Sequence, residues 1–110
     1  PILQRHQIVR RGSSAGDLEL DRASRELRVG GQSEKLSNKA FQLMELLAER
    51  PHVVHSVDAI MQQVWGWDSE AEINVVWVNI SLLRKKLKKL GAHVEIVAAR
   101  GQGYSLSETT

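Results

Sequence analysis

The chain has no cysteine among its 110 residues. Disulfide bonds, thiolate zinc sites and cysteine nucleophiles are therefore all excluded. It also has no apolar run near the roughly 20 residues that a membrane-spanning helix needs, and its N-terminus lacks a signal-peptide pattern. Because these features are missing, we expect a cytoplasmic domain that makes no contact with a membrane.

Residues for catalysis or metal binding are also scarce. Of the four histidines, His52 and His55 are close in sequence, whereas His6 and His93 are distant from them. Without cysteine, two nearby histidines are a weak metal signal, so we expect them in a loop or in the core. No segment combines a nucleophile, a base and an oxyanion site. The sequence therefore predicts a protein that is not an enzyme and uses no metal or cofactor.

Positive charge is concentrated in the last third of the chain, although the net charge is only +2. Residues 1–72 hold nine Lys/Arg and eleven Asp/Glu, whereas residues 73–110 hold six and two. All but one of those six cations lie within residues 84–89. A local basic cluster favours a polyanionic partner, but it is also typical of a solvated helix surface. Its meaning depends on the fold around it.

The run from Asn74 to Leu90 predicts an amphipathic helix. Its apolar residues recur at intervals of four, three, four and three, which places them on one helix face. These residues are Val76, Ile80, Leu83, Leu87 and Leu90. The other faces carry amides, a serine and the basic cluster. Gly91 follows, where a left-handed C-cap would stand, and the lysines of the last turns complement the helix dipole.

Two shorter helices are predicted before this long basic helix. Ser37 is a candidate N-cap for the first, and Pro51 ends it because a proline disfavours helical backbone in the preceding residue. Ser56 is a candidate N-cap for the second, which continues with apolar residues at helical spacing as far as Trp65. The loop 66–70 then leads into the long basic helix.

Short alternating runs flank the three helices. Leu18–Leu20 and Leu27–Val29, followed by a pair of glycines, predict an antiparallel sheet of two or three strands. Beyond the long helix, alternating residues on both sides of the glycine turn 101–103 predict a terminal β-hairpin.

This order of elements is typical of an α+β winged helix-turn-helix: an N-terminal antiparallel sheet, a three-helix bundle and a C-terminal hairpin wing. In that architecture the last helix enters the major groove of DNA, and the hairpin lies along the backbone or the minor groove. Here the third helix carries the basic cluster and the hairpin tip carries Arg100. The layout makes DNA a candidate partner of both.

Four short motifs occur in register along the chain. Leu36–Met44 (LSNKAFQLM) opens the first helix and Val64–Gly66 (VWG) closes the second. Asn74–Leu87 (NVVWVNISLLRKKL) forms most of the third helix, and Arg100–Tyr104 (RGQGY) is the hairpin tip. Together the motifs resemble the OmpR/PhoB-type effector domain of bacterial two-component response regulators. The resemblance covers roughly residues 18–106.

The resemblance implies a four-stranded N-terminal sheet, a three-helix bundle and a wing, placed after a phosphorylatable receiver domain. We therefore expect residues 1–16 to be the linker from a missing receiver, residues 17–107 to be the winged-helix DNA-binding domain, and residues 108–110 to be a C-terminal tail. The start at Pro1, without an initiator methionine, agrees with a piece of a longer protein.

The resemblance also implies macromolecular partners. In some family members the loop between the second and third helices contacts RNA polymerase. The corresponding residues here are Trp67, Asp68 and Glu70. Because one domain of this size offers a small footprint, we expect the full-length protein to bind promoter direct repeats as a homodimer, with half-sites about one helical turn apart.

The chain departs from the family pattern at positions that bear on base recognition. Trp77 stands where an aspartate is usual, and Ser81 and Leu82 occupy positions where many members have arginines. Ala40 replaces the glutamate that would complete a capping box. Without an arginine fork early in the third helix, base recognition has to rest on amides, a hydroxyl and apolar groups.

The predicted DNA-binding residues form two groups. The first is expected to meet base edges through hydrogen bonds or through the methyl group of thymine: Asn74, Val78, Asn79, Ser81 and Leu82. The second is expected to bind phosphates: Arg84, Lys85, Lys89 and Arg100. Lys86 and Lys88 project from other sides of the helix.

Several side chains have alternative roles. Asn74 is either a base contact or a helix cap, and Arg84 either binds phosphate or holds its helix through an internal salt bridge. Trp65 and Tyr104 occupy apolar-periodic positions and are expected in the core. Trp77 either packs against the sheet or marks a protein interface.

The sequence therefore predicts sequence-specific binding to double-stranded DNA and transcriptional regulation, as the output domain of a two-component response regulator. The alternative is a winged-helix protein-interaction module whose base recognition has weakened, with Trp67 or Trp77 in its interface. Retention on a DNA column against rising salt concentration distinguishes these two functions.

Overall fold

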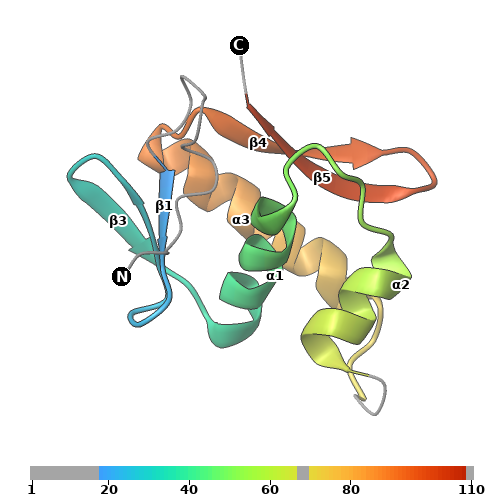
Figure 1. The fold of residues 1–110 in the computed structure, drawn as a ribbon. Coiled ribbons are helices and arrows are strands. Elements are labelled where there is room, and N and C mark those ends of the chain that lie inside the picture. Colours follow the sequence, from blue (N-terminus) through green and yellow to red (C-terminus); the bar gives the residue numbers. More distant parts are fainter. Residues whose placement is uncertain (1–17, 67–69, 109–110) are drawn as a thin grey trace.

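The structure is a computed structural model that describes residues 18–66 and 70–108. Its elements follow the predicted order of sheet, three helices and hairpin (Figure 1). The elements are β1 (Leu18–Asp21), β2 (Glu26–Val29), β3 (Gln32–Lys35), α1 (Asn38–Glu49), α2 (Val57–Ile60), η2 (Met61–Trp65), α3 (Asn74–Leu90), β4 (Val94–Ala99) and β5 (Gly103–Glu108). The expected linker 1–16 lies outside the described residues, and β5 extends one residue past the predicted domain boundary at residue 107.

The N-terminal sheet is antiparallel, in the order β1-β2-β3. Leu18 and Leu20 on β1 are buried, as are Leu27 and Val29 on β2, because alternate residues of a strand point to the same face of the sheet. The edge strand β3 has no buried residue. The prediction of two or three strands is confirmed; the described part of the sheet has three strands where the family resemblance implied four.

Both serine N-caps are confirmed. The Ser37 hydroxyl accepts a hydrogen bond from the backbone N–H of Ala40 at 3.2 Å, and the Ser56 hydroxyl accepts one from Ala59 at 3.0 Å. Each cap satisfies a backbone donor that has no partner within its own helix. The first helix ends at Glu49, just before Pro51, as the proline rule requires.

The second helix widens into a π-helical turn that its apolar spacing did not predict. After α2 the chain continues as η2, and the Gly66 N–H donates to the Met61 carbonyl at 2.9 Å, which closes a wider ring than an α-helical bond does. The carbonyl of Val64, in the last turn of η2, accepts a hydrogen bond from Nζ of Lys39 on α1 at 2.9 Å. A side chain from another helix therefore satisfies a carbonyl at the end of η2.

The long helix α3 packs against α1 and against both sheets. It contacts α1, β3 and β4, and Figure 1 shows it crossing the molecule between the sheet β1–β3 and the hairpin β4–β5. All five predicted stripe residues are buried. Gly91 is in the left-handed conformation predicted for it, where the N–H groups of Gly91 and Ala92 donate to Lys88 and Leu87 at 3.0 Å each. This paired arrangement is a Schellman C-cap.

An ion-pair cluster joins the C-terminal half of α3 to the sheet. Glu34 on β3 accepts from Nζ of Lys86 and from Nζ of Lys89, each at 3.1 Å. These two hydrogen bonds, with the positive charges behind them, hold the pKa of Glu34 below its ordinary value of 4.5. One carboxylate therefore ties two successive turns of α3 to the edge strand.

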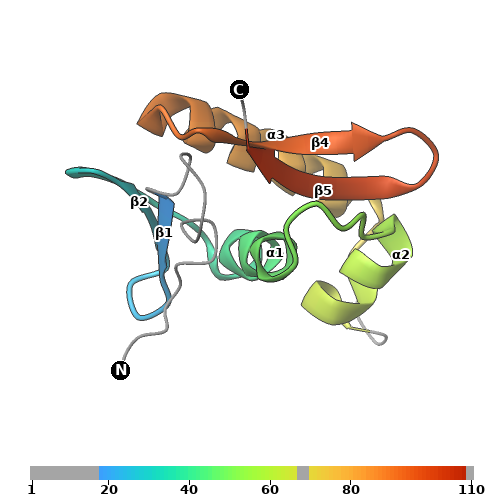
Figure 2. The ribbon, with the colours of Figure 1, turned by 45° about the horizontal axis from the view of Figure 1, so that its top comes forward.

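The hairpin is joined to the loop between α1 and α2 along the first residues of β5, next to the tip turn. The backbone of His55 both donates to and accepts from Tyr104, at 2.8 and 3.0 Å, and the His52 N–H donates to Leu106 at 2.8 Å. Figure 2 shows the hairpin as a layer over α1. Gly103 lies so close to this bridge that an added Cβ would stand 1.9 Å from the carbonyl oxygen of His55. The second glycine of the RGQGY motif is therefore needed for close backbone contact.

We expect the substitution Gly103→Ala to lower the free energy of unfolding by at least about 1–3 kcal/mol, because the methyl group overlaps immobile backbone. Gly31→Ala is the matched control, since an added Cβ there meets nothing within 4 Å. Urea denaturation of the two variants measures the difference. Equal midpoints for both would contradict the role assigned to Gly103.

The Glu34 cluster predicts a defined pH dependence. A carboxylate whose pKa is lower in the folded protein stabilises the fold above its unfolded pKa and loses that contribution as the pH falls through the folded value. Glu34→Gln should therefore be less stable than the parent at pH 7, by a small margin because the pair is partly solvated, and the difference should shrink below pH 4.5. Urea midpoints at several pH values test this; a constant difference would count against it.

Candidate nucleic-acid interface

The side of α3 opposite its buried stripe carries a strip of predicted DNA-binding residues. Asn74, Val78, Ser81 and Lys85 follow one another at intervals of four, three and four, so they share one face of the helix. Asn74, Val78 and Lys85 are exposed and Ser81 is half-buried. We call these four residues the α3 strip. It offers an amide, an apolar group, a hydroxyl and a cation to a partner.

Asn74 does not cap the helix. The N-cap position is held by Ile73, which makes no side-chain cap hydrogen bond, and α3 begins at Asn74 itself. The N–H groups of Val75 and Val76 bond instead to the carbonyls of Glu72 and Ile73, at 3.0 and 3.1 Å. The helix-cap alternative for Asn74 is therefore wrong, and its exposed amide belongs to the α3 strip.

Two other predicted base contacts lie beside the strip. Asn79 is half-buried, and its Nδ2 donates to the carbonyl of Val75 at 2.9 Å, one turn back along the same helix. That bond occupies one of the amide donors that base recognition would use. Leu82 is also half-buried and packs against the core. Of the five predicted base contacts, the structure thus brings together Asn74, Val78 and Ser81.

Arg84 connects α3 to the wing. Its Nε donates to the carbonyl of Ile96 on β4 at 3.1 Å, and its Cζ lies 6.0 Å from the centre of the Tyr104 ring on β5. The prediction that Arg84 could hold its helix is thus correct. The predicted salt bridge is wrong, because the partners are a carbonyl and a ring instead of a carboxylate. A guanidinium has five N–H donors, so the exposed side chain still has hydrogens to offer a phosphate.

The four lysines of α3 differ in their surroundings. Lys86 is half-buried against Glu34, whereas Lys89 shares that carboxylate while its side chain remains 72% exposed. Exposed pairs of this kind contribute little to stability, so a phosphate can replace Glu34 as the partner of Lys89. Lys85 and Lys88 are exposed. Lys88, which was not assigned to DNA, is therefore as accessible as Lys85.

The wing tip presents Arg100 to solvent. Arg100 and Gly101 form the turn between β4 and β5, which is closed by a hydrogen bond from the Gln102 N–H to the Ala99 carbonyl at 2.8 Å. Gly101 has a φ of 72°, a conformation that favours glycine. Arg100 is exposed on this turn, and Figure 1 shows the turn at the far end of the hairpin β4–β5. The motif thus combines a cation with two glycines that shape the turn and its base.

The aromatic residues divide between the core and the surface. Trp65 and Tyr104 are partly buried and pack against the core, as predicted. Trp77 is 60% exposed, so the expectation that it packs against the sheet is wrong. The apolar spacing of α3 excluded Trp77 from the buried stripe but could not show that no neighbouring element covers it. Of the proposed polymerase contacts, Glu70 is exposed, while Trp67 and Asp68 lie outside the described residues.

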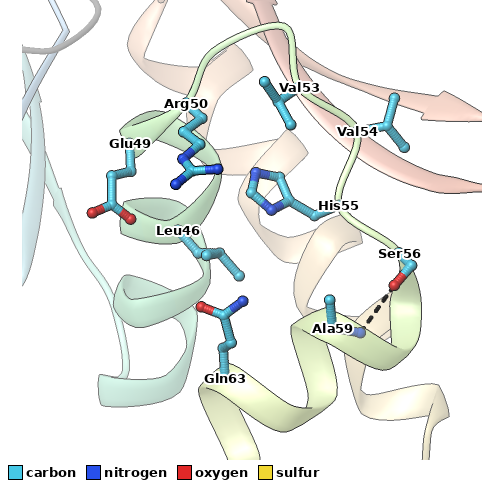
Figure 3. Close-up of a pocket in the computed structure, with 9 residues that line it drawn as sticks. All are labelled: Leu46, Glu49, Arg50, Val53, Val54, His55, Ser56, Ala59 and Gln63. Atoms are coloured by element: carbon cyan, nitrogen blue, oxygen red, sulfur yellow. Dashed lines mark hydrogen bonds between the residues drawn. The ribbon is translucent and has the colours of Figure 1, made fainter.

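A separate hollow of about 430 Å³ lies between α1, α2 and the loop that joins them (Figure 3). His55 points into it, and its Nε2 is buried without a hydrogen-bond partner. Burial, together with the positive charge of Arg50, lowers the pKa of His55. Its neighbour in sequence, His52, pairs instead with Glu108 at 3.0 Å. Both histidines lie in the loop between α1 and α2, as predicted, and their side chains have different surroundings.

Within residues 18–66 and 70–108, no group of three or more His, Cys, Asp or Glu side chains is placed to hold a metal ion. No helix in the same ranges is long and apolar enough to cross a bilayer. The exposed cations of α3 and the Arg100 turn favour a polyanionic partner.

Comparison with known proteins agrees with this geometry. Residues 31–106 match the family model described as transcriptional regulatory protein, C terminal. Over 108 residues the chain is 37% identical to the heme response regulator HssR of Staphylococcus saprophyticus. The aligned region covers 97% of this chain and 48% of the relative. The chain spans about half the length of the curated relatives it matches.

Two solved structures share the fold at 28% identity. The C-terminal domain of the nisin resistance regulator NsrR, a lantibiotic response regulator, superimposes with a TM-score of 0.73 over 86% of this chain and 96% of that one. The DNA-binding domain of Klebsiella pneumoniae RstA, in complex with the RstA box, gives 0.66 over 84% and 92%. The chain therefore belongs to the transcriptional regulatory protein C-terminal family, the OmpR/PhoB-type winged-helix output domains of response regulators.

Proposed function

We propose that this domain binds double-stranded DNA through the α3 strip and the Arg100 turn, and that it regulates transcription as the output of a two-component response regulator in the bacterial cytoplasm. The observation that carries the proposal is the α3 strip itself. It joins an amide, an apolar group, a hydroxyl and a cation on the exposed side of a helix that contains no acidic residue. The RstA domain, solved with the RstA box, supports this use of the fold.

The chemistry of the interface follows from the two kinds of contact. The major groove of B-DNA is wide enough for an α-helix, so the α3 strip would meet base edges there. Lys85, Lys88 and the exposed end of Lys89 would bind phosphates along the groove. Arg100 would reach the backbone or the minor groove beside it. Phosphate contacts supply most of the affinity, whereas the α3 strip and the shape of the DNA supply selectivity.

The assembly extends the footprint of one small domain. Two copies on direct repeats about one helical turn apart would each place an α3 helix in the major groove on the same side of the duplex. Linkage through receiver domains would raise the affinity for paired half-sites without any new DNA contact. HssR and NsrR are named as response regulators, which supports this arrangement for the full-length protein.

A second contact surface is favoured by one observation. Glu70 is exposed on the segment that leads into α3, in the loop where some family members meet RNA polymerase. We propose Trp67, Asp68 and Glu70 as the polymerase-facing residues of this chain. A protein-binding module without DNA recognition is the less supported function, because the exposed residues of α3 include three lysines and no carboxylate.

Removing a phosphate contact should weaken binding to every sequence. Lys85→Ala and Arg100→Ala should each lower affinity for enriched and scrambled duplexes alike, and should reduce the slope of log affinity against log salt by about 0.9. Lys35→Ala, which removes an exposed lysine at the end of β3, is the matched control. The measurement is fluorescence anisotropy at several salt concentrations, with duplexes enriched from a randomised library.

An altered sequence preference with an unchanged salt slope would contradict the phosphate role of Lys85 and Arg100. Failure of the unmodified domain to bind either duplex at low salt would remove the proposed function itself. In that case the protein-binding alternative would become the leading function for the exposed surface of α3.

The two asparagines of α3 form a matched pair for base recognition. Asn74→Ala should reduce discrimination between enriched and scrambled duplexes by about 1–3 kcal/mol, because an exposed amide in the groove bonds base edges. Asn79→Ala should change discrimination much less, because the Asn79 amide is bonded to the Val75 carbonyl. Parallel titrations of both variants test the assignment; a larger effect at Asn79 would reverse it.

A further inference from the structure

Three large apolar side chains are exposed together at the start of α3. Ile73, Trp77 and Val78 are 55%, 60% and 52% exposed, the three largest values for large hydrophobic residues in the described chain. Ile73 and Trp77 are one helical turn apart, and Val78 belongs to the α3 strip. An exposed apolar cluster of this kind indicates a binding surface, because leaving it in water is unfavourable.

The position of Trp77 on the helix shows which side of the α3 strip it extends. Ser81, Arg84 and Lys88 follow Trp77 at intervals of four, three and four, so they share its side of α3. Arg84 on that side bonds the Ile96 carbonyl of β4. Trp77 therefore lies between the α3 strip and the wing side of the helix, next to the residues that we assign to DNA.

The charges around the cluster indicate what covers it. Helix α3 itself has no Asp or Glu, and exposed lysines lie two to three turns farther along, at Lys85 and Lys88, whereas the exposed Glu70 and Glu72 precede Ile73 on the other side. An apolar cluster on a helix whose own charges are all positive suits a polyanion that also presents an apolar group. DNA does so in the major groove, where thymine carries the only exposed methyl group among the four bases.

The arginine of α3 is not placed to make the usual arginine–base contact. The most common specific major-groove contact is a bidentate pair between arginine and guanine. The one arginine of α3, Arg84, gives its Nε to β4 and stands over the Tyr104 ring, outside the α3 strip. Exposed apolar area therefore replaces the guanidinium as the main side-chain chemistry that the first turns of α3 offer to bases.

We propose that Trp77, supported by Ile73, is a specificity-determining residue that binds thymine methyl groups beside the α3 strip. This inference rests on the proposed DNA-binding function and names its target chemistry: half-sites that carry thymines at the positions facing Trp77. The indole supplies a large rigid apolar face with few rotatable bonds, so ordering it on the groove costs little conformational entropy.

The test exchanges thymine for uracil in DNA. A duplex enriched from a randomised library is synthesised with 2′-deoxyuridine at one thymine position at a time, which preserves base pairing and phosphate charge and removes only the 5-methyl group. Wherever the protein covers that methyl group, affinity should fall about fourfold, which corresponds to about 0.8 kcal/mol for one buried methyl-sized group.

The substitution Trp77→Ala identifies which methyl contacts belong to the indole. At one or more thymine positions that cost the parent domain about fourfold, uracil should become neutral for this variant. Val53→Ala, which truncates an exposed apolar residue in the loop between α1 and α2, should keep the parent pattern. Because Trp77 is exposed, we expect the fold of the variant to be retained, and its urea midpoint checks this.

Each outcome separates this inference from the function on which it rests. If the enriched duplex is preferred over a scrambled one but uracil costs nothing at any position, DNA binding stands and methyl recognition is overturned. If methyl sensitivity persists in full in Trp77→Ala, or if this variant binds all duplexes as the parent does, the assignment to Trp77 is overturned. If no duplex is bound at all, the proposed function itself fails.

Discussion

Burial of one stripe along α3 is the constraint on which the rest of the structure depends. Five apolar residues, spaced so that they share one face, contribute to a core that also includes residues from both sheets and α1. Burying each such side chain contributes about 1.5–3 kcal/mol. Rotating the helix by one residue would expose part of the stripe, so the same burial decides which residues of α3 face solvent. The α3 strip is exposed because the apolar residues on the opposite face of the helix are buried.

Polar contacts on both flanks add precision to that orientation. On the wing side Arg84 reaches the backbone of β4, and on the sheet side Glu34 accepts from Lys86 and Lys89. Individually these surface contacts are weak. Their value lies in position: they act on opposite sides of one helix and oppose its rotation in either direction. Arg84 and Lys89, which the sequence predicts to bind phosphates, thus also hold the helix that carries the interface.

Local sequence signals predicted the elements well, because their causes lie within a few residues. The serine caps, the proline stop, the Gly91 C-cap and the buried stripe each depend on neighbours along the chain. Contacts between distant segments were less predictable. The widened turn of η2 and its Lys39 contact, the bond from Asn79 to Val75, the carbonyl partner of Arg84 and the exposure of Trp77 all depend on rotamers or on which element packs nearby. Periodicity gives the side of a helix on which a residue lies, but it cannot show which other element packs against that side.

The backbone bridge between His55 and Tyr104 has a mechanical consequence. It fixes the start of β5, beside the tip turn of the hairpin, to the loop between the first two helices, and Gly103 allows the two backbones to approach closely. The bridge therefore holds the wing at a fixed spacing from α3. A duplex whose groove width does not match that spacing has to deform to contact both elements, and the elastic energy of deforming DNA depends on its sequence. Base pairs that no side chain touches then contribute to target choice through their stiffness.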